Sequence, residues 1–170
     1  MKTKLFIIVA LFALAVPCFG QQNTIWEKWV PLIGEWKGEG SGQPGQGGGT
    51  FSFHFDLDQK ILVRKGHSEY PATAQKPKIV HDDLMIIYAD GSSGAPSKAI
   101  YFDNEGHLIH YTITYPEKSI ILTSEKTANA PVFRLTYTLL ENQTFHTRFE
   151  MSADGEKFMT YLEGNSTRTE

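Results

Sequence analysis

The residues that most invite a metal or acid–base interpretation are the six histidines: His54, His67, His81, His107, His110 and His146. Side chains of one strand share a face only at even spacing. His107 and His110 lie three positions apart in a segment with strand character, so they point to opposite faces. No two histidines have the same-face spacing of a strand, and the sequence therefore predicts no metal site. A site assembled across strands is the alternative.

The run His81-Asp82-Asp83 is a second candidate, because it puts an imidazole beside two carboxylates just before an apolar stretch. Such a triplet can act as a general base or bind a cation weakly. Acidic residues where a strand begins also commonly cap a turn and stay in water. We favour this structural interpretation.

Cationic residues within otherwise apolar segments are the third candidates. A charge inside a folded core must be paired, either by a ligand carboxylate or by an internal acid such as Glu69, Glu150 or Glu163. Arg64 and His67 are an odd number of positions apart, so only one of them faces the interior, and we favour His67. Arg134 alternates with an apolar face and is expected to point outward, and Arg148 stays open.

The elements that would position these residues are strands. Phe51, Phe53 and Phe55 alternate with polar residues, which is the period of a half-buried strand. The same pattern, with turn residues between segments, predicts strands near 33–41, 50–58, 60–70, 83–90, 97–104, 107–115, 119–125, 131–140, 143–151 and 157–167. A short helix is expected from Thr24 to Pro31, because Thr24 can cap it and Glu27 follows three residues later.

An antiparallel meander of this length has two edges that would recruit other chains, and closure into a barrel removes both. The sequence therefore predicts an all-β fold, a single antiparallel up-and-down β-barrel of about ten strands. An immunoglobulin-like sandwich is the competing architecture. The loops 42–49 and 71–78, rich in glycine or interrupted by proline, are expected at the open rim of the barrel.

Residues 1–20 have the order of a secretory signal: Lys2 and Lys4, an apolar run, and a small-residue end at Gly20. We expect cleavage there, with residues 21–170 forming the barrel domain; a membrane anchor and lipidation of Cys18 are the alternatives. Removing two lysines and no acid changes the net charge from −3 to −5. The mature domain is then acidic, has no cysteine, and is expected in the periplasm or outside the cell, without membrane or nucleic-acid partners.

The segment 34–40, Gly-Glu-Trp-Lys-Gly-Glu-Gly, resembles the opening of calycin barrels such as lipocalins and fatty-acid-binding proteins. With ten strands it is more similar to nitrobindin-like haem-binding barrels and related secreted bacterial barrels. That resemblance implies ferric haem held by a histidine of the last strand. Here the last predicted strand has no histidine, and Tyr161 stands near that position. Tyrosinate can bind ferric haem, but we expect no tight haem binding and no other cofactor.

The sequence favours a binding module whose interior accepts a small apolar or amphipathic molecule. The candidate ligand-binding residues are Phe53, Phe55, Arg64, His67, Tyr88, Tyr101 and Tyr161. Two alternatives stay open. One is an isomerase or hydrolase at the barrel mouth, built on Arg64, His67 or His81, although no catalytic motif supports it. The other is a barrel filled by its own side chains that acts as an interaction domain.

Overall fold

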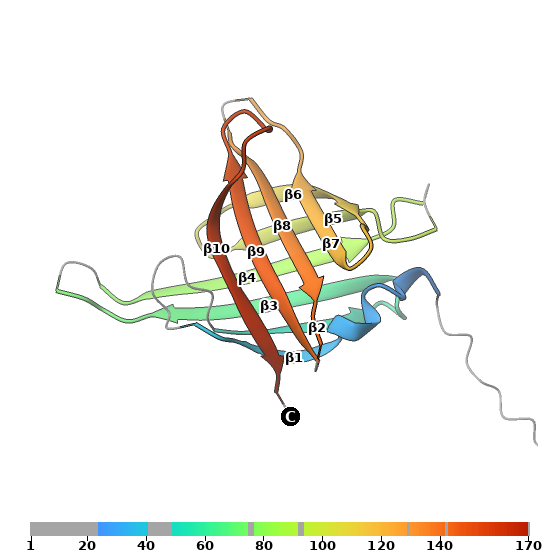
Figure 1. The fold of residues 1–170 in the computed structure, drawn as a ribbon, viewed down its shortest axis with the longest axis horizontal. Helices are drawn as coiled ribbons and strands as arrows, with labels where there is room; N and C mark the ends of the chain where they lie inside the picture. The colour runs from blue at the N-terminus through green and yellow to red at the C-terminus, as the bar shows by residue number, and fades with distance from the viewer. Residues whose placement is uncertain are drawn as a thin grey trace, which may run out of the picture.

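The computed structural model is a closed antiparallel barrel in which each strand pairs with its neighbours in the chain (Figure 1). It describes residues 24–40, 49–74, 77–91, 94–128, 130–141 and 143–169. The strands are β1 (Gly34–Gly38), β2 (Thr50–Asp56), β3 (Ile61–Tyr70), β4 (Ile79–Tyr88), β5 (Lys98–Asp103), β6 (Leu108–Thr114), β7 (Ser119–Ser124), β8 (Val132–Leu139), β9 (Thr144–Ser152) and β10 (Met159–Arg168). The predicted up-and-down barrel of ten strands is confirmed, and the sandwich is wrong.

Pairing of β1 with β10 closes the barrel. Trp36 lies opposite Arg168, Lys37 opposite Thr167 and Gly38 opposite Ser166. Because β1 also pairs with β2, neither end of the meander is left as a free edge. Closure makes alternate residues of all ten strands share one interior.

The strand β4 begins four residues earlier than expected. The prediction started it near residue 83, whereas the ladder with β3 runs from Ile79 opposite Tyr70 to Tyr88 opposite Ile61. Hydrogen bonding to a long partner strand holds residues 79–82 extended despite the polar side chains of His81 and Asp82. The run His81-Asp82-Asp83 is therefore part of a strand and not a turn cap.

The N-terminal segment closes one end of the barrel, but not as the expected helix. It forms two single 3-10 turns, η1 (Thr24–Trp26) and η2 (Val30–Leu32). With three residues per turn, Trp26, Trp29 and Leu32 fall on one face, and all three are buried. An α-helical turn of 3.6 residues would rotate these side chains progressively away from the barrel.

We call this N-terminal segment, with Trp26, Trp29 and Leu32, the plug. Three indole N–H groups at this end of the barrel donate hydrogen bonds that hold it in place. Trp26 donates to the carbonyl of Gln59 at 2.9 Å, Trp29 to the hydroxyl of Tyr115 at 2.9 Å, and Trp36 to the carbonyl of Leu32 at 2.7 Å. Each large ring therefore fills space and satisfies its polar atom as well. We call this the closed end.

The opposite end is the open rim. There β1 ends at Gly38, β2 begins at Thr50, β3 ends at Tyr70 and β4 begins at Ile79. These strand ends flank both loops that were expected at the rim, so their strands lead there as predicted. Most of loop 42–49, and residues 75 and 76 of loop 71–78, lie outside the described residues.

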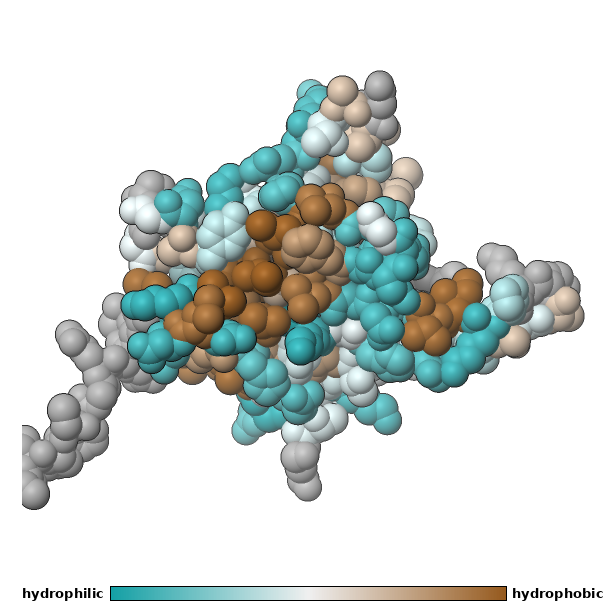
Figure 2. Space-filling view, turned by 180° about the vertical axis from the view of Figure 1, so that it is seen from behind, coloured by the Kyte–Doolittle hydropathy of each residue, from teal (hydrophilic) through white to brown (hydrophobic). Residues whose placement is uncertain are grey.

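The outer face of β3 to β6 carries apolar side chains. Val63 lies opposite Ile86 and Ile86 opposite Ile100, while Phe102 lies between Leu84 and Leu108. All of them alternate with the inward-facing residues of their strands. Figure 2 views this side of the barrel and shows hydrophobic residues gathered in its middle.

The expected signal, residues 1–20, lies outside the described residues and stays a prediction. Within the part of the chain that is described, no helix has the length and apolar character needed to cross a membrane.

Trp36 is expected to be a major stabilising residue. Its side chain is 1% exposed, packs edge-on against Phe145 with ring centroids 4.5 Å apart, and lies under the guanidinium of Arg168 at 4.6 Å. Trp36→Ala should lower the free energy of unfolding by about 3–5 kcal/mol, because the cavity cannot collapse at the barrel closure. Denaturant unfolding measures it, with the outward-facing Leu108→Ala as the control. Equal midpoints for the two variants would contradict the prediction.

Candidate functional site

A buried ion pair lies on the inner wall of the barrel. Arg64 of β3 donates through Nη1 to Oδ1 of Asp83 on β4, and the two side chains are only 16% and 9% exposed. The residue opposite Asp83 in the ladder is Gly66, where any side chain would collide with the Asp83 carboxylate. The absence of a side chain at Gly66 thus gives Asp83 the space to reach Arg64.

Three tyrosines on neighbouring strands surround the pair: Tyr101 of β5, Tyr111 of β6 and Tyr137 of β8. Burial raises the pKa of each phenol, that of Tyr137 to about 12. Arg64 lowers these pKa values and Asp83 raises them, but burial is the largest cause for each. All three hydroxyls therefore keep their protons at neutral pH. We call Arg64, Asp83, Tyr101, Tyr111 and Tyr137 the interior polar cluster.

The interior polar cluster rests on an aromatic layer toward the closed end. Phe53 packs edge-on against Tyr137 with ring centroids 5.7 Å apart, and Phe145 contacts Phe51 at 5.6 Å and Tyr137 at 5.7 Å. The guanidinium carbon of Arg64 lies 5.0 Å from the centre of the Phe51 ring. This cation–π contact adds to the ion pair in holding Arg64 in the interior.

Exposure changes along the barrel axis. Leu62, Ile87 and Phe53 face inward near the closed end and are 0% exposed. On the rim side of the interior polar cluster, other residues with inward register stay half-buried, among them Ile109, Phe133, Leu135 and Phe149. Solvent therefore reaches these rim-side apolar side chains but not Leu62, Ile87 and Phe53.

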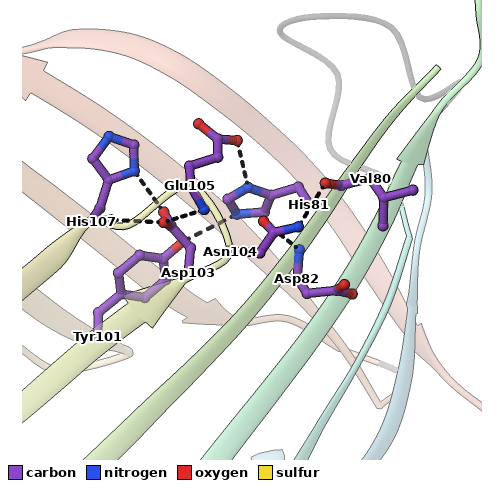
Figure 3. A network of polar contacts seen from close by, with 8 residues as sticks. All are labelled: Val80, His81, Asp82, Tyr101, Asp103, Asn104, Glu105 and His107. Carbon is purple, nitrogen blue, oxygen red and sulfur yellow. Dashed lines mark hydrogen bonds and ion pairs between the residues drawn. The ribbon is translucent and has the colours of Figure 1, made fainter. Parts of the chain in front are cut away.

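A polar network occupies one side of the open rim (Figure 3). His81 contacts Glu105 through Nδ1 at 3.0 Å and the hydroxyl of Tyr101 through Nε2 at 3.1 Å. Tyr101 in turn donates to Asp103 at 3.3 Å, and the His107 ring contacts the same carboxylate at 2.8 Å. These contacts link the first residues of β4 to the turn between β5 and β6.

The network holds the turn in place. Asp103 accepts the backbone N–H groups of Glu105 and His107, and Asn104 bridges the backbone of Val80 and Asp82. Both ring nitrogens of His81 have partners, so neither is left free for a substrate proton. The arrangement stabilises the mouth and gives no support to the enzyme hypothesis.

In the run His81-Asp82-Asp83, successive side chains point to opposite faces of the barrel wall. His81 and Asp83 face inward, whereas Asp82 faces outward and contacts Nδ1 of His67 at 2.6 Å. Arg64 faces inward and His67 outward, half-exposed, so the preference for His67 is wrong. The reason is parity: Arg64 shares its face with the fully buried Leu62, and His67 does not.

The other predicted ligand-binding residues are dispersed. Phe53 and Tyr101 lie in the interior with Arg64, whereas Phe55 packs against Trp26 at the closed end, with ring centroids 5.3 Å apart. Tyr88 faces outward, since its neighbour Ile87 is buried inside. Tyr161 stands at a bulge of β10 on the rim, 61% exposed.

Two other arginines face outward and are paired. Arg134 points outward as predicted, but it is not free of partners: it binds Glu150 through Nε and Nη2 at 2.7 and 3.0 Å and stacks on Phe158. Arg148 pairs with Glu163 at 3.1 Å.

Sequence reasoning missed Gly66, Tyr111, Tyr137 and Thr147 as interior groups. Tyr137 follows Phe133 and Leu135 at the two-residue spacing of one strand face, and this was the one available signal. Nothing local marks Tyr111 or Gly66, because their roles depend on partners from other strands.

No protein-family model and no curated protein matches this sequence. The structure supports the calycin-like barrel on architecture alone. Over the described residues, no three histidine, cysteine or acidic side chains are grouped so that they could hold a metal ion.

Asp103 should make stability depend on pH. Burial favours its protonated form, but the N–H and ring of His107 and the N–H of Glu105 outweigh this, so the pKa of Asp103 is lowered. A lowered folded-state pKa gives stability that is present above the ordinary value of about 4 and is lost as the pH falls through the folded value. Asp103→Asn should cost about 1 kcal/mol at neutral pH and progressively less toward about pH 3.

Urea unfolding across this pH range measures the difference, with the exposed turn residue Asp58 changed to asparagine as the control. A deficit of Asp103→Asn that does not change with pH would contradict the assignment of the stabilisation to the Asp103 charge.

Proposed function

We propose that this protein is a binding barrel that takes a small apolar or amphipathic molecule through its open rim. The observation that carries the proposal is a difference in exposure between inward-facing side chains. Leu62, Ile87 and Phe53 are fully buried, whereas the residues toward the rim are half-buried, namely Ile109, Phe133, Leu135 and Phe149. A barrel filled by its own side chains would bury its inward residues at both ends.

The chemistry of the interior supports an amphipathic ligand. Apolar contact is offered by Ile109, Phe133, Leu135 and Phe149 on the rim side, and polar contact by the interior polar cluster beneath them. A mostly apolar site with a few convergent polar groups is the usual composition of a small-molecule pocket. We also propose that the protein works in the periplasm or outside the cell, which rests on the signal-like order of residues 1–20.

The resemblance to nitrobindin-like barrels would imply one specific ligand, haem. We expect tight haem binding to be absent. The hydroxyl expected near the missing histidine belongs to Tyr161, which is 61% exposed at the rim and has its ring nearly perpendicular to that of Phe149. Strand β10 therefore offers iron neither a histidine nor a buried tyrosine. Titration with ferric haem should give no saturable absorbance change. A saturable change that Tyr161→Phe abolishes would overturn this expectation.

The binding proposal is tested with N-phenylnaphthylamine, a neutral apolar dye whose fluorescence rises in apolar surroundings. Wild-type protein should bind it saturably. Ile109→Trp, which adds volume to the rim side of the interior, should weaken binding by at least about tenfold.

The matched control is Leu108→Trp, the neighbouring position on the same strand, whose side chain faces outward and is 57% exposed. It should leave the affinity within about twofold of wild type. Absence of saturable binding, or equal loss in both variants, would defeat the proposed function.

A further inference from the structure

Three buried polar atoms inside the barrel have no hydrogen-bond partner among the described residues: Nε of Arg64, the hydroxyl of Tyr137 and the hydroxyl of Thr147. Each of the three atoms carries a hydrogen and can donate it. Buried polar groups are nearly always paired in folded proteins, so three unpaired donors in one interior need an explanation.

The three donors surround one region. Tyr137 of β8 lies directly opposite Thr147 of β9, and Arg64 of β3 lies opposite Phe53, whose ring contacts Tyr137 at 5.7 Å. Tyr137 and Arg64 also lie close enough to interact electrostatically. The Tyr137 residue is 2% exposed. The donors therefore stand above the aromatic layer formed by Phe51, Phe53 and Phe145.

The charge of this region is already balanced. Arg64 has Asp83 as its ion-pair partner, so the pair has no net charge. A ligand carboxylate placed here would bring an uncompensated negative charge into a buried site beside Asp83, which is costly. A neutral acceptor would take the free donors without adding charge.

We propose that the ligand of this barrel is an apolar molecule with a neutral hydrogen-bond acceptor, such as the carbonyl of a ketone, ester or amide, and not a carboxylic acid. The acceptor oxygen binds Nε of Arg64 and the hydroxyl of Tyr137, with Thr147 beside them. The proposal rests on the binding function proposed above and specifies the ligand class of the same site. Because the pKa of Tyr137 is raised to about 12 by burial, its hydroxyl remains a donor throughout the neutral range.

The test is displacement of N-phenylnaphthylamine by methyl octyl ketone or by decanoate, two molecules with equal numbers of carbon atoms. On wild-type protein the ketone should displace the dye at a concentration at least about tenfold lower than decanoate. Tyr137→Phe should reduce this preference at least about fivefold, whereas the outward-facing Tyr88→Phe should leave it unchanged. Asp83→Asn removes the compensating charge from Arg64 and should shift the preference toward decanoate.

The outcomes separate the two proposals. Absence of saturable dye binding defeats the binding function and this inference with it. Saturable dye binding with decanoate equal to or better than the ketone on wild type, or with the preference intact in Tyr137→Phe, overturns the inference alone. If Asp83→Asn does not fold, Tyr137→Phe decides the question, because it keeps the ring that packs against Phe53 and Phe145.

Discussion

The pairing of β1 with β10 is the constraint on which the remaining structure depends. It involves only a few residue pairs, from Trp36 opposite Arg168 to Gly38 opposite Ser166. Without it, the meander would be an open sheet with two free edges and no enclosed interior. The plug formed by Trp26, Trp29 and Leu32 fills the barrel beside this seam, and the indole of Trp36 donates to the carbonyl of Leu32. Closure and plugging are therefore parts of one packing arrangement.

Once the barrel is closed, its two ends differ. The closed end is an aromatic core in which the three indole N–H groups are hydrogen-bonded. The other end admits solvent to inward-facing apolar side chains and is braced by the network around His81 and Asp103. Between them stands the interior polar cluster, where a buried arginine is neutralised by Asp83. A buried pair of this kind adds little net stability compared with apolar residues of similar volume, so stability alone does not explain its presence in the middle of the barrel.

Several features could be predicted from the sequence because they depend on local patterns. Alternation of Phe51, Phe53 and Phe55 with polar residues defines a half-buried strand, and the turn residues between such segments set the strand number. The segment 34–40, with glycines around Trp36, was matched to the opening of a calycin barrel, and Trp36 is buried where the barrel closes. The prediction from local patterns placed the start of β4 four residues too late, and it gave the N-terminal segment as a helix where two 3-10 turns form. In both cases a tertiary partner, the β3 ladder for β4 and the barrel end for the tryptophans, outweighs local preference.

By itself, then, the amino-acid sequence determined the all-β class, the order of the strands and the likeness of residues 34–40 to a calycin opening, because each depends on residues close together in the chain. Only the tertiary structure decided that Arg64 faces inward and His67 outward, since a shift of one residue in register exchanges the two faces of a strand. It also brought Asp83 to Arg64 across Gly66, and Tyr137 and Thr147 to the same interior. These contacts join strands far apart in sequence, and the closed ladder of hydrogen bonds is what fixes their relative positions.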